Sequence, residues 1–290
     1  MKEIDYLAPT SLGEAYGALQ NGKTSAFLAG GTDIIVQLRE GRKQVDQLID
    51  VKHIPELTSY GWTADGGLEI GASVPFAELY EDAEIVQRLP AVIDCATLIG
   101  GIQIQSRACF GGNIGNSGPA ADTVPALIAL GATLTLGSQG GTRALPLEDF
   151  FTGPGQNVLA PGELIVKVNI PAQPANSGSF FHRFIPRNEM DIAVVNVGVR
   201  LDLSAAGDRI EAARISIGAV APVPLFVPAA GEALVGQAPT AEAFAAAADA
   251  AAAAATPITD MRGSIAQRVH LTRVLTNRAL DKALERAREA

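Results

Sequence analysis

Two glycine-rich segments contain the residues best suited to binding a phosphorylated ligand. The first is LAGGTDII at 28–35, and the second is CFGGNIGNSGPAADTVPAL at 109–127. Glycine has no side chain to block the backbone and accepts positive φ angles, so its N–H groups can approach an anion closely. A helical pattern follows each segment, and the first N–H groups of a helix also attract anions. Together the two segments predict a site that holds a pyrophosphate from two sides.

Neither segment identifies the ligand by itself. Each one alone is typical of an ordinary tight turn or a surface loop. No GK[ST] follows, as a Walker loop would require, and neither segment gives the dinucleotide motif GxGxxG after a strand. Asp122, at the start of the second helical pattern, either favours the helix dipole or accepts hydrogen bonds from ligand hydroxyls. Phosphates would repel this carboxylate, so we expect it to face a sugar or polyol.

Composition excludes several classes of protein. The formal net charge is −9 and no basic stripe is visible, which argues against a nucleic-acid partner. The two cysteines, Cys95 and Cys109, are too few to hold an iron–sulfur cluster and indicate reduced thiols. The three histidines lack metal-ligand spacing. No secretory signal or membrane-spanning run is apparent, so the sequence predicts a cytoplasmic protein without a metal site.

Hydrophobic periodicity predicts an α/β portion followed by a smaller α+β portion. In the first portion, the expected strands lie at 24–30, 45–51, 66–74 and 163–171, and the expected helices at 11–20, 33–41 and 83–98. The composition changes near 171–179. Beyond this point, alternating segments predict antiparallel strands, and three helical patterns follow at 228–236, 240–255 and 264–287.

Four motifs in order carry a resemblance to a known family. They are AGGTDII, FGGNIGNSGPAADTVPALIALGATL, LPLEDFFTGPG and RFIPRNEMDIAVVNVGV, and the tail from RISIGAV onward continues the match. The chain resembles, over nearly its whole length, the FAD-binding medium subunit of the molybdenum hydroxylases, which include xanthine dehydrogenase and carbon monoxide dehydrogenase.

The resemblance implies a fold of class α/β plus α+β. Residues 1–175 would be a two-subdomain FAD-binding fold of the vanillyl-alcohol-oxidase-like type, divided at about 1–55 and 56–175. Residues 176–290 would be the small C-terminal domain of antiparallel strands and helices that this flavin subunit carries.

The resemblance also implies cofactor-binding residues and no catalytic residue or metal ligand. Backbone N–H groups of Gly30, Gly31 and Thr32 would hold the pyrophosphate, and Asp122 would bond FAD hydroxyls. Cys109 stands where relatives often have Ser or Thr. Many relatives carry a Lys followed by two Arg residues in the loop where this chain has the single Arg187. The full set is Phe27, Leu28, Ala29, Gly30, Gly31, Thr32, Asp33, Ile34, Ile99, Gly100, Cys109, Phe110, Gly111, Gly112, Asn113, Asp122, Ile165, Arg183 and Ile192.

The implied activity is electron transfer in a heteromeric complex. The molybdenum cofactor would lie on a large subunit, and two [2Fe–2S] clusters on a small one. This chain would take electrons from those clusters onto FAD and pass them to an external acceptor, in a dimer of heterotrimers without membrane insertion. The substrate stays open, as does the acceptor, with NAD, oxygen, a quinone and a cytochrome as candidates.

Three other interpretations compete with this one. A stand-alone flavin oxidase or reductase of similar fold would need its own acid/base residues, and none is recognisable. A non-catalytic module that binds a phosphorylated ligand would be colourless. A structural α/β protein would use the glycines only for turns.

Overall fold

The first 50 residues form a small parallel sheet. The computed structural model describes residues 3–187 and 189–290. This first sheet has the order β1-β3-β2, and because parallel strands need a crossover, a helix connects each strand to the next. The first helix lies within the predicted range 11–20, and the Ser11 side chain caps it by accepting from the N–H of Glu14. The elements are β1 (Asp5–Leu7), α1 (Leu12–Ala18), β2 (Ser25–Leu28), α2 (Ile34–Arg39) and β3 (Gln47–Asp50).

One side of the first sheet has only a thin apolar cover. Helix α2 packs there through Leu38, which is buried with Ala26 and Val45 in a separate small cluster. The other side, which includes Ile49, joins the main core of the molecule. The first sheet therefore depends on its neighbours for most of its buried surface.

A second, antiparallel sheet follows with the order β4-β5-β10-β6-β7. The predicted helix at 83–98 is broken in two at Pro90, since proline starts a helix well but cannot continue one. The strands are β4 (Tyr60–Trp62), β5 (Leu68–Gly71), β6 (Thr133–Ser138), β7 (Gly141–Pro146) and β10 (Leu164–Ile170), beside the hairpin β8 (Phe151–Gly153) and β9 (Gln156–Asn157). The helices are α3 (Pro55–Thr58), α4 (Phe76–Tyr80), α5 (Ala83–Arg88), α6 (Pro90–Ala96), α7 (Ile102–Gln105), α8 (Phe110–Asn116), α9 (Thr123–Ala129) and the 3₁₀ helix η1 (Leu147–Asp149).

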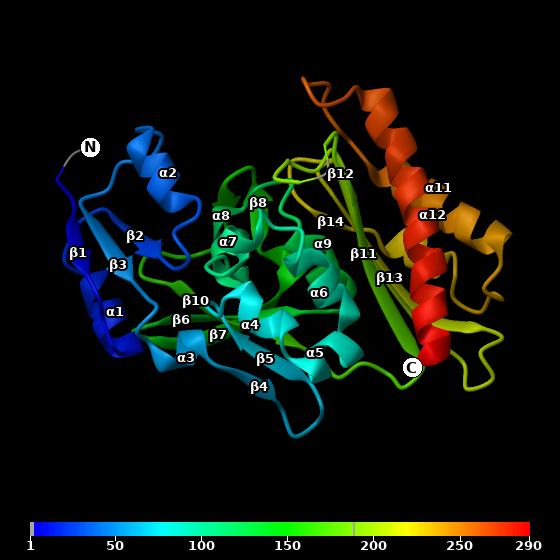
Figure 1. The fold of residues 1–290 in the computed structure, drawn as a ribbon, viewed down its shortest axis with the longest axis horizontal. Helices are drawn as coiled ribbons and strands as arrows, with labels where there is room; N and C mark the ends of the chain where they lie inside the picture. The colour runs from blue at the N-terminus through cyan, green and yellow to red at the C-terminus, as the bar shows by residue number, and fades with distance from the viewer. Residues whose placement is uncertain (1–2, 188) are drawn as a thin grey trace.

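The third sheet confirms the predicted antiparallel strands and helices of the C-terminal part. Its order is β11-β12-β13-β14. Figure 1 shows α11 and α12 on its outer side and α9 on the side that faces the second sheet. The elements are β11 (Ser177–Phe184), β12 (Val195–Leu203), β13 (Ile210–Gly218), β14 (Leu225–Phe226), α10 (Pro228–Glu232), α11 (Ala241–Ala254) and α12 (Ile265–Glu289).

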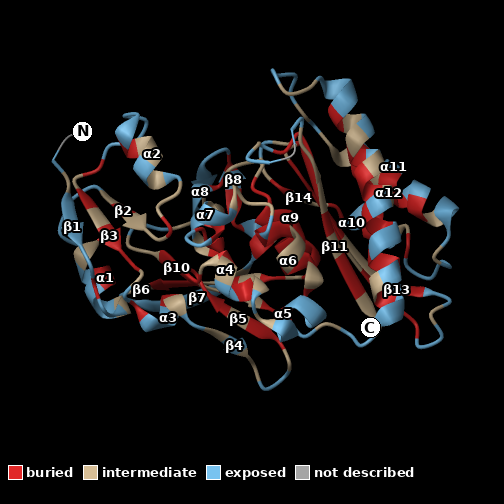
Figure 2. Ribbon diagram, in the orientation of Figure 1, coloured by how far each residue is buried: buried red, intermediate tan, exposed pale blue. Residues whose placement is uncertain are grey.

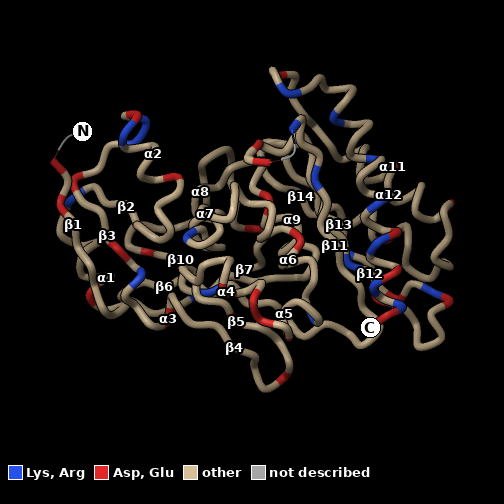
Figure 3. Tube along the Cα trace, viewed as in Figure 1, with Lys and Arg blue, Asp and Glu red and all other residues tan. Residues whose placement is uncertain are grey.

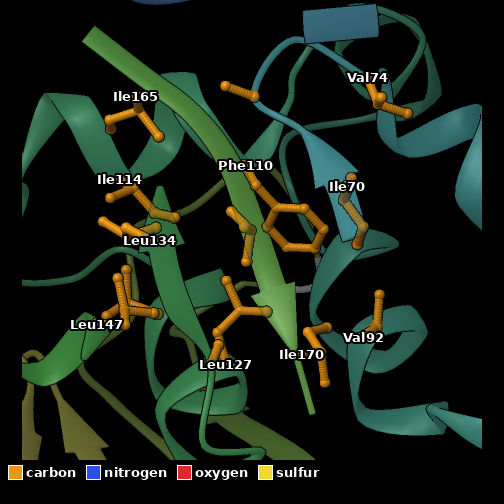
Figure 4. Packing of buried hydrophobic residues seen from close by; sticks show 14 of the residues in the cluster. Ile70, Val74, Val92, Phe110, Ile114, Leu127, Leu134, Leu147, Ile165 and Ile170 are labelled. Carbon is orange, nitrogen blue, oxygen red and sulfur yellow. The ribbon is translucent and has the colours of Figure 1, made fainter. Parts of the chain in front are cut away.

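The main hydrophobic core lies around the second sheet, and α9 joins it to the third. Figure 2 shows buried residues along β10, β5 and α9, and every residue of α9 is buried. Figure 4 shows Phe110 at the centre of this core, between Ile70 and Ile114. Its ring lies edge-on to that of Phe76, with 5.0 Å between ring centroids.

Close backbone packing holds α9 against the third sheet. A Cβ at Gly198 of β12 would lie 2.2 Å from the backbone oxygen of Pro125. At the C-terminal end of α9, Arg214 Nε donates to the Ile128 oxygen at 3.0 Å, and Arg200 Nη1 lies 3.5 Å from the Leu130 oxygen. Both arginines sit where the helix leaves carbonyl groups unpaired and the dipole is negative.

Charged residues are mixed in sign over the outer elements. Figure 3 shows Lys and Arg interspersed with Asp and Glu along the described chain. A search of the described residues finds no helix that is both long and apolar enough to cross a membrane.

The packing at Gly198 generates a stability prediction. Gly198→Ala is expected to lower the free energy of unfolding by roughly 2–3 kcal/mol, because a Cβ cannot fit beside Pro125 without backbone movement. Gly17→Ala is the matched control: Gly17 lies exposed in α1 with nothing within 4 Å of an added Cβ. It should raise stability by about 0.5–1 kcal/mol. Urea unfolding measures both, and equal effects of the two substitutions would contradict the packing argument.

Candidate functional site

A cavity of about 560 Å³ lies between elements of the first and second sheets. Its size is within the range of pockets that enclose small molecules. Most of its wall comes from three separate parts of the chain. They are the segment from β2 through α2, the segment from Ala108 to Asn116, and the stretch from Gly155 to Ile165.

The first glycine turn packs against Arg107, two residues before the second glycine-rich segment begins. A Cβ at Gly30 would lie 2.1 Å from the backbone oxygen of Arg107, so only glycine fits there. Arg107 Nε donates in turn to the Gly30 oxygen at 3.1 Å. Gly31 has a φ of 81°, in the left-handed region that favours glycine. These contacts hold the two glycine-rich segments side by side.

The second glycine-rich segment is itself a helix, which corrects the expectation of a loop before a helix. Residues 110–116 form α8, which ends at Ser117 with a φ of 51°. The Gly111 N–H donates to the Ala72 oxygen at 2.9 Å, and a Cβ at Gly111 would lie 2.5 Å from that oxygen. Tertiary packing therefore overrides the low helix propensity of glycine here. Gly112 and Gly115 line the cavity and leave its wall free of side chains.

Cys109 lies where the two turns meet. Its thiol is placed so that the N–H groups of Gly30 and Gly112 can donate to it, and a Cβ at Gly112 would come within 3.3 Å of its Sγ. Burial nevertheless raises the pKa of the Cys109 thiol, and these two N–H groups oppose that effect only in part. The residue is therefore a neutral thiol at pH 7 that fills the junction of the cavity walls.

Side-chain amides connect the walls of the cavity. Gln37 Nε2 of α2 donates to Asn116 Oδ1 of α8 at 3.0 Å. Asn157 Nδ2 of β9 donates to Ser117 Oγ at 3.0 Å. The first sheet, α8 and the β8–β9 hairpin are thereby held around one space.

Asp122 and Arg183, which the family resemblance places among the cofactor-binding residues, pair with each other, and neither lines this cavity. Arg183 Nη1 donates to Asp122 Oδ2, and Asn196 Nδ2 donates to Asp122 Oδ1 at 2.9 Å. Burial raises the pKa of Asp122 even though Arg183 and Asn196 favour the charged form. Both oxygens of the carboxylate are thus occupied by residues of the third sheet, as expected for a buried charge that needs partners.

Most of the sequence-predicted residues lie together on the cavity wall. Those on the wall are Phe27, Ala29, Gly30, Gly31, Thr32, Asp33, Ile34, Ile99, Cys109, Gly111, Gly112, Asn113 and Ile165. Those that lie elsewhere are Leu28, Gly100, Phe110, Asp122, Arg183 and Ile192.

The residues off the wall have identifiable surroundings. Phe110 is buried in the main core, and Leu28 contacts the outer side of the turn at Gly31. Gly100 makes a left-handed turn before α7. Ile192 is about half exposed, in the loop between β11 and β12. Within that loop, Asn188 lies outside the described residues.

Sequence reasoning missed part of the wall. Gln37 and Lys43 line the cavity beside the predicted helix, and Gln37 lies one turn after Ile34, so helical spacing could have indicated it. Asn157 and Leu159 also line the cavity. They come from a Gly/Pro-rich loop whose composition gave no sign of a ligand contact. Among the described residues, no group of three or more His, Cys, Asp or Glu side chains could hold a metal ion.

Two family models match the chain. The FAD binding domain in molybdopterin dehydrogenase matches residues 2–173, and the CO dehydrogenase flavoprotein C-terminal domain matches residues 180–283. These matches confirm the family resemblance drawn from the four motifs.

Known proteins resemble the chain over almost its full length. The carbon monoxide dehydrogenase medium chain of Hydrogenophaga pseudoflava is 32% identical and covers 98% of both chains. The nicotinate dehydrogenase FAD-subunit of Eubacterium barkeri is 33% identical and covers 85% of this chain and 84% of its own.

Solved structures agree with these relatives. A carbon monoxide dehydrogenase structure from H. pseudoflava superposes with a TM-score of 0.93 at 32% identity, over 98% of both chains. Quinoline 2-oxidoreductase from Pseudomonas putida 86 gives 0.91 at 28% identity, over 99% of both. The chain therefore belongs to the flavoprotein family of the molybdopterin dehydrogenases, with an FAD-binding domain followed by a CO dehydrogenase flavoprotein C-terminal domain.

Proposed function

We propose that the cavity holds FAD, and that the chain is the flavin subunit of a heteromeric molybdenum hydroxylase. In that role it takes electrons from the [2Fe–2S] clusters of a partner and passes them to an external acceptor. The observation that carries the proposal is the meeting of both glycine-rich segments on one cavity wall. A structural protein would not require this arrangement, and the match of residues 2–173 to an FAD binding domain favours FAD over another phosphorylated ligand.

The residues on the cavity wall fit a flavin dinucleotide. Gly30, Gly31 and Gly112 present backbone without side chains where the two walls meet, which suits a pyrophosphate. Phe27 and Ile165 offer apolar surface for ring systems at other parts of the wall. When bound, FAD supplies the redox chemistry, and the chain's part is to bind it, orient it and limit its contact with water.

The division of the chain belongs to the same proposal. We place the FAD-binding part at 1–175, with subdomains at about 1–55 and 56–175, and the C-terminal domain at 176–290. A vanillyl-alcohol-oxidase-like fold is supported by a cavity between a small parallel sheet and a larger antiparallel one. Met1, Lys2 and Asn188 are outside the described residues.

The metal centres are assigned to partner subunits. Cys95 and Cys109 are both buried, free thiols, so they cannot supply the four ligands that a cluster usually takes. The proposed partners are a large subunit with the molybdenum cofactor and a small subunit with two [2Fe–2S] clusters, arranged as a dimer of heterotrimers. The relatives named as medium chains support such a complex. The two free thiols also suit the reducing conditions of the cytoplasm, which we propose as the location.

The first experiment measures cofactor content and electron flow. The purified chain should show a flavin absorption spectrum and release FAD on denaturation in a near one-to-one ratio. Reduction of that flavin by an organic substrate should require the co-expressed large and small subunits. A chain that neither contains nor takes up FAD would contradict the proposal. Reduction by substrate without partners would support the stand-alone oxidase or reductase instead.

A substitution at Gly111 tests the cavity wall. Gly111→Ala is expected to weaken FAD binding roughly tenfold or more, because its Cβ would push α8 away from the Ala72 oxygen. Gly118→Ala is the control, since nothing lies within 4 Å of a Cβ there. Titration of apoprotein with FAD measures both dissociation constants. An unchanged FAD dissociation constant in Gly111→Ala would show that FAD affinity does not depend on the position of α8.

The thiol of Cys109 provides a second probe of the same site. Iodoacetamide should modify it slowly at pH 7 and faster as the pH rises, because burial raises its pKa and keeps the thiolate scarce at neutral pH. Bound FAD should slow the reaction further, since Cys109 lines the cavity. Cys95, which is fully buried in the core, should react only after unfolding. Peptide mass spectrometry measures both rates, and an equal Cys109 rate with and without FAD would place the cofactor elsewhere.

A further inference from the structure

One hydroxyl behind the cavity wall contacts the side-chain amide of Asn113. Thr123 is fully buried at the start of α9 and does not line the cavity. Its Oγ1 lies 2.6 Å from Asn113 Oδ1. That carbonyl oxygen can only accept a hydrogen bond, so the hydroxyl of Thr123 is the donor. Asn113 itself is on the cavity wall.

This contact leaves the NH₂ end of Asn113 for the ligand. No described residue accepts a hydrogen bond from Asn113 Nδ2. Phosphate and flavin carbonyl oxygens are acceptors, so they bind the NH₂ end of an amide and are repelled by its oxygen. The Thr123 hydroxyl is fully buried, so a turned amide would leave its proton without an acceptor among the described residues. Without the hydroxyl, either end of the amide could face the ligand.

The position of Thr123 is fixed from the other side by the third sheet. Its neighbour Asp122 receives hydrogen bonds from Arg183 and Asn196, and these three side chains are buried. Gly218 lies against Asn196, where a Cβ would come within 2.2 Å of Oδ1. These contacts hold the first turn of α9 against β11 and β12, and the hydrogen bond from Thr123 to Asn113 joins that turn to α8.

We propose that Thr123 is a positioning residue for FAD, which acts by locking Asn113 with its Nδ2 donor towards the cofactor. Asp122, Arg183 and Asn196 support this lock from the C-terminal part of the chain. The inference rests on the proposed function, because it takes FAD as the ligand of the cavity. Thr123 lies within the second glycine-rich segment but is not among the cofactor-binding residues that the family resemblance implies.

Three variants of the full chain test the hydroxyl, with FAD titration of the apoprotein as the measurement. Thr123→Val keeps the shape and removes the donor, and it should raise the FAD dissociation constant roughly tenfold. Thr123→Ser keeps the donor and should stay within about twofold of the natural protein. Thr276→Val is the matched control, because Thr276 is equally buried in α12 and its hydroxyl donates to the Thr272 oxygen. It should leave FAD binding unchanged.

A double-mutant cycle tests whether Thr123 acts through Asn113. In an Asn113→Ala background, Thr123→Val should have no further effect on FAD affinity, since the amide it positions is gone. Thermal unfolding of the apoproteins separates a loss of affinity from a loss of fold.

Several results would overturn the inference. One is that Thr123→Val binds FAD as tightly as the unchanged chain. Another is that Thr123→Ser binds FAD as weakly as Thr123→Val. The third is that the effects of Asn113→Ala and Thr123→Val on FAD affinity add in the double-mutant cycle. All three results can be obtained only if the unchanged chain binds FAD. If the unchanged chain does not bind FAD, the proposed function fails instead.

Discussion

Helix α9 has no exposed residue, and the third sheet holds it at both ends. Arg214 and Arg200 approach its last carbonyl groups, while Arg183 and Asn196 bind the carboxylate of Asp122 before its first turn. Gly198 allows β12 to touch the helix backbone between these ends. The helix also contacts α8, which forms part of the cavity wall. The geometry of the cavity thus depends on packing in a part of the chain that does not line it.

The buried ion pair of Asp122 and Arg183 contributes more to the selection of one packing arrangement than to the free energy of unfolding. Removing two charges from water is costly, and the attraction between them often only balances that cost. Loss of one partner, in contrast, leaves an uncompensated charge and is strongly destabilising. Arg183 Nε and Asn196 Oδ1 are, moreover, buried without a hydrogen-bond partner among the described residues. The cluster therefore selects one arrangement of the third sheet on α9, at some expense in stability.

Local signals predicted most of the elements, and tertiary contacts explain the exceptions. The helices expected at 11–20 and 264–287 begin beside Ser11 and Ser264, whose side chains each accept an N–H of the first helical turn. Capping is a local interaction, so a local pattern suffices to place such helices. The helical state of 110–116 was missed because it depends on the approach of Gly111 to Ala72, which lie far apart in sequence. The family resemblance supplied the residues of both glycine segments. It could not predict that Asn157 lines the cavity, nor that Asp122 pairs with Arg183, since both depend on which segments meet in space.

Helix α2 contributes one buried residue, Leu38, to the protein interior. It packs on the first sheet through a small cluster around Leu38, while Ile34 and Gln37 face the cavity and Gln37 reaches across to Asn116. Regions with few buried contacts open more readily than the rest of a protein, and a ligand that binds only the closed form suppresses that opening. FAD in the proposed site would complete a core that the first sheet does not build for itself. Its binding would therefore slow proteolysis of this part of the chain.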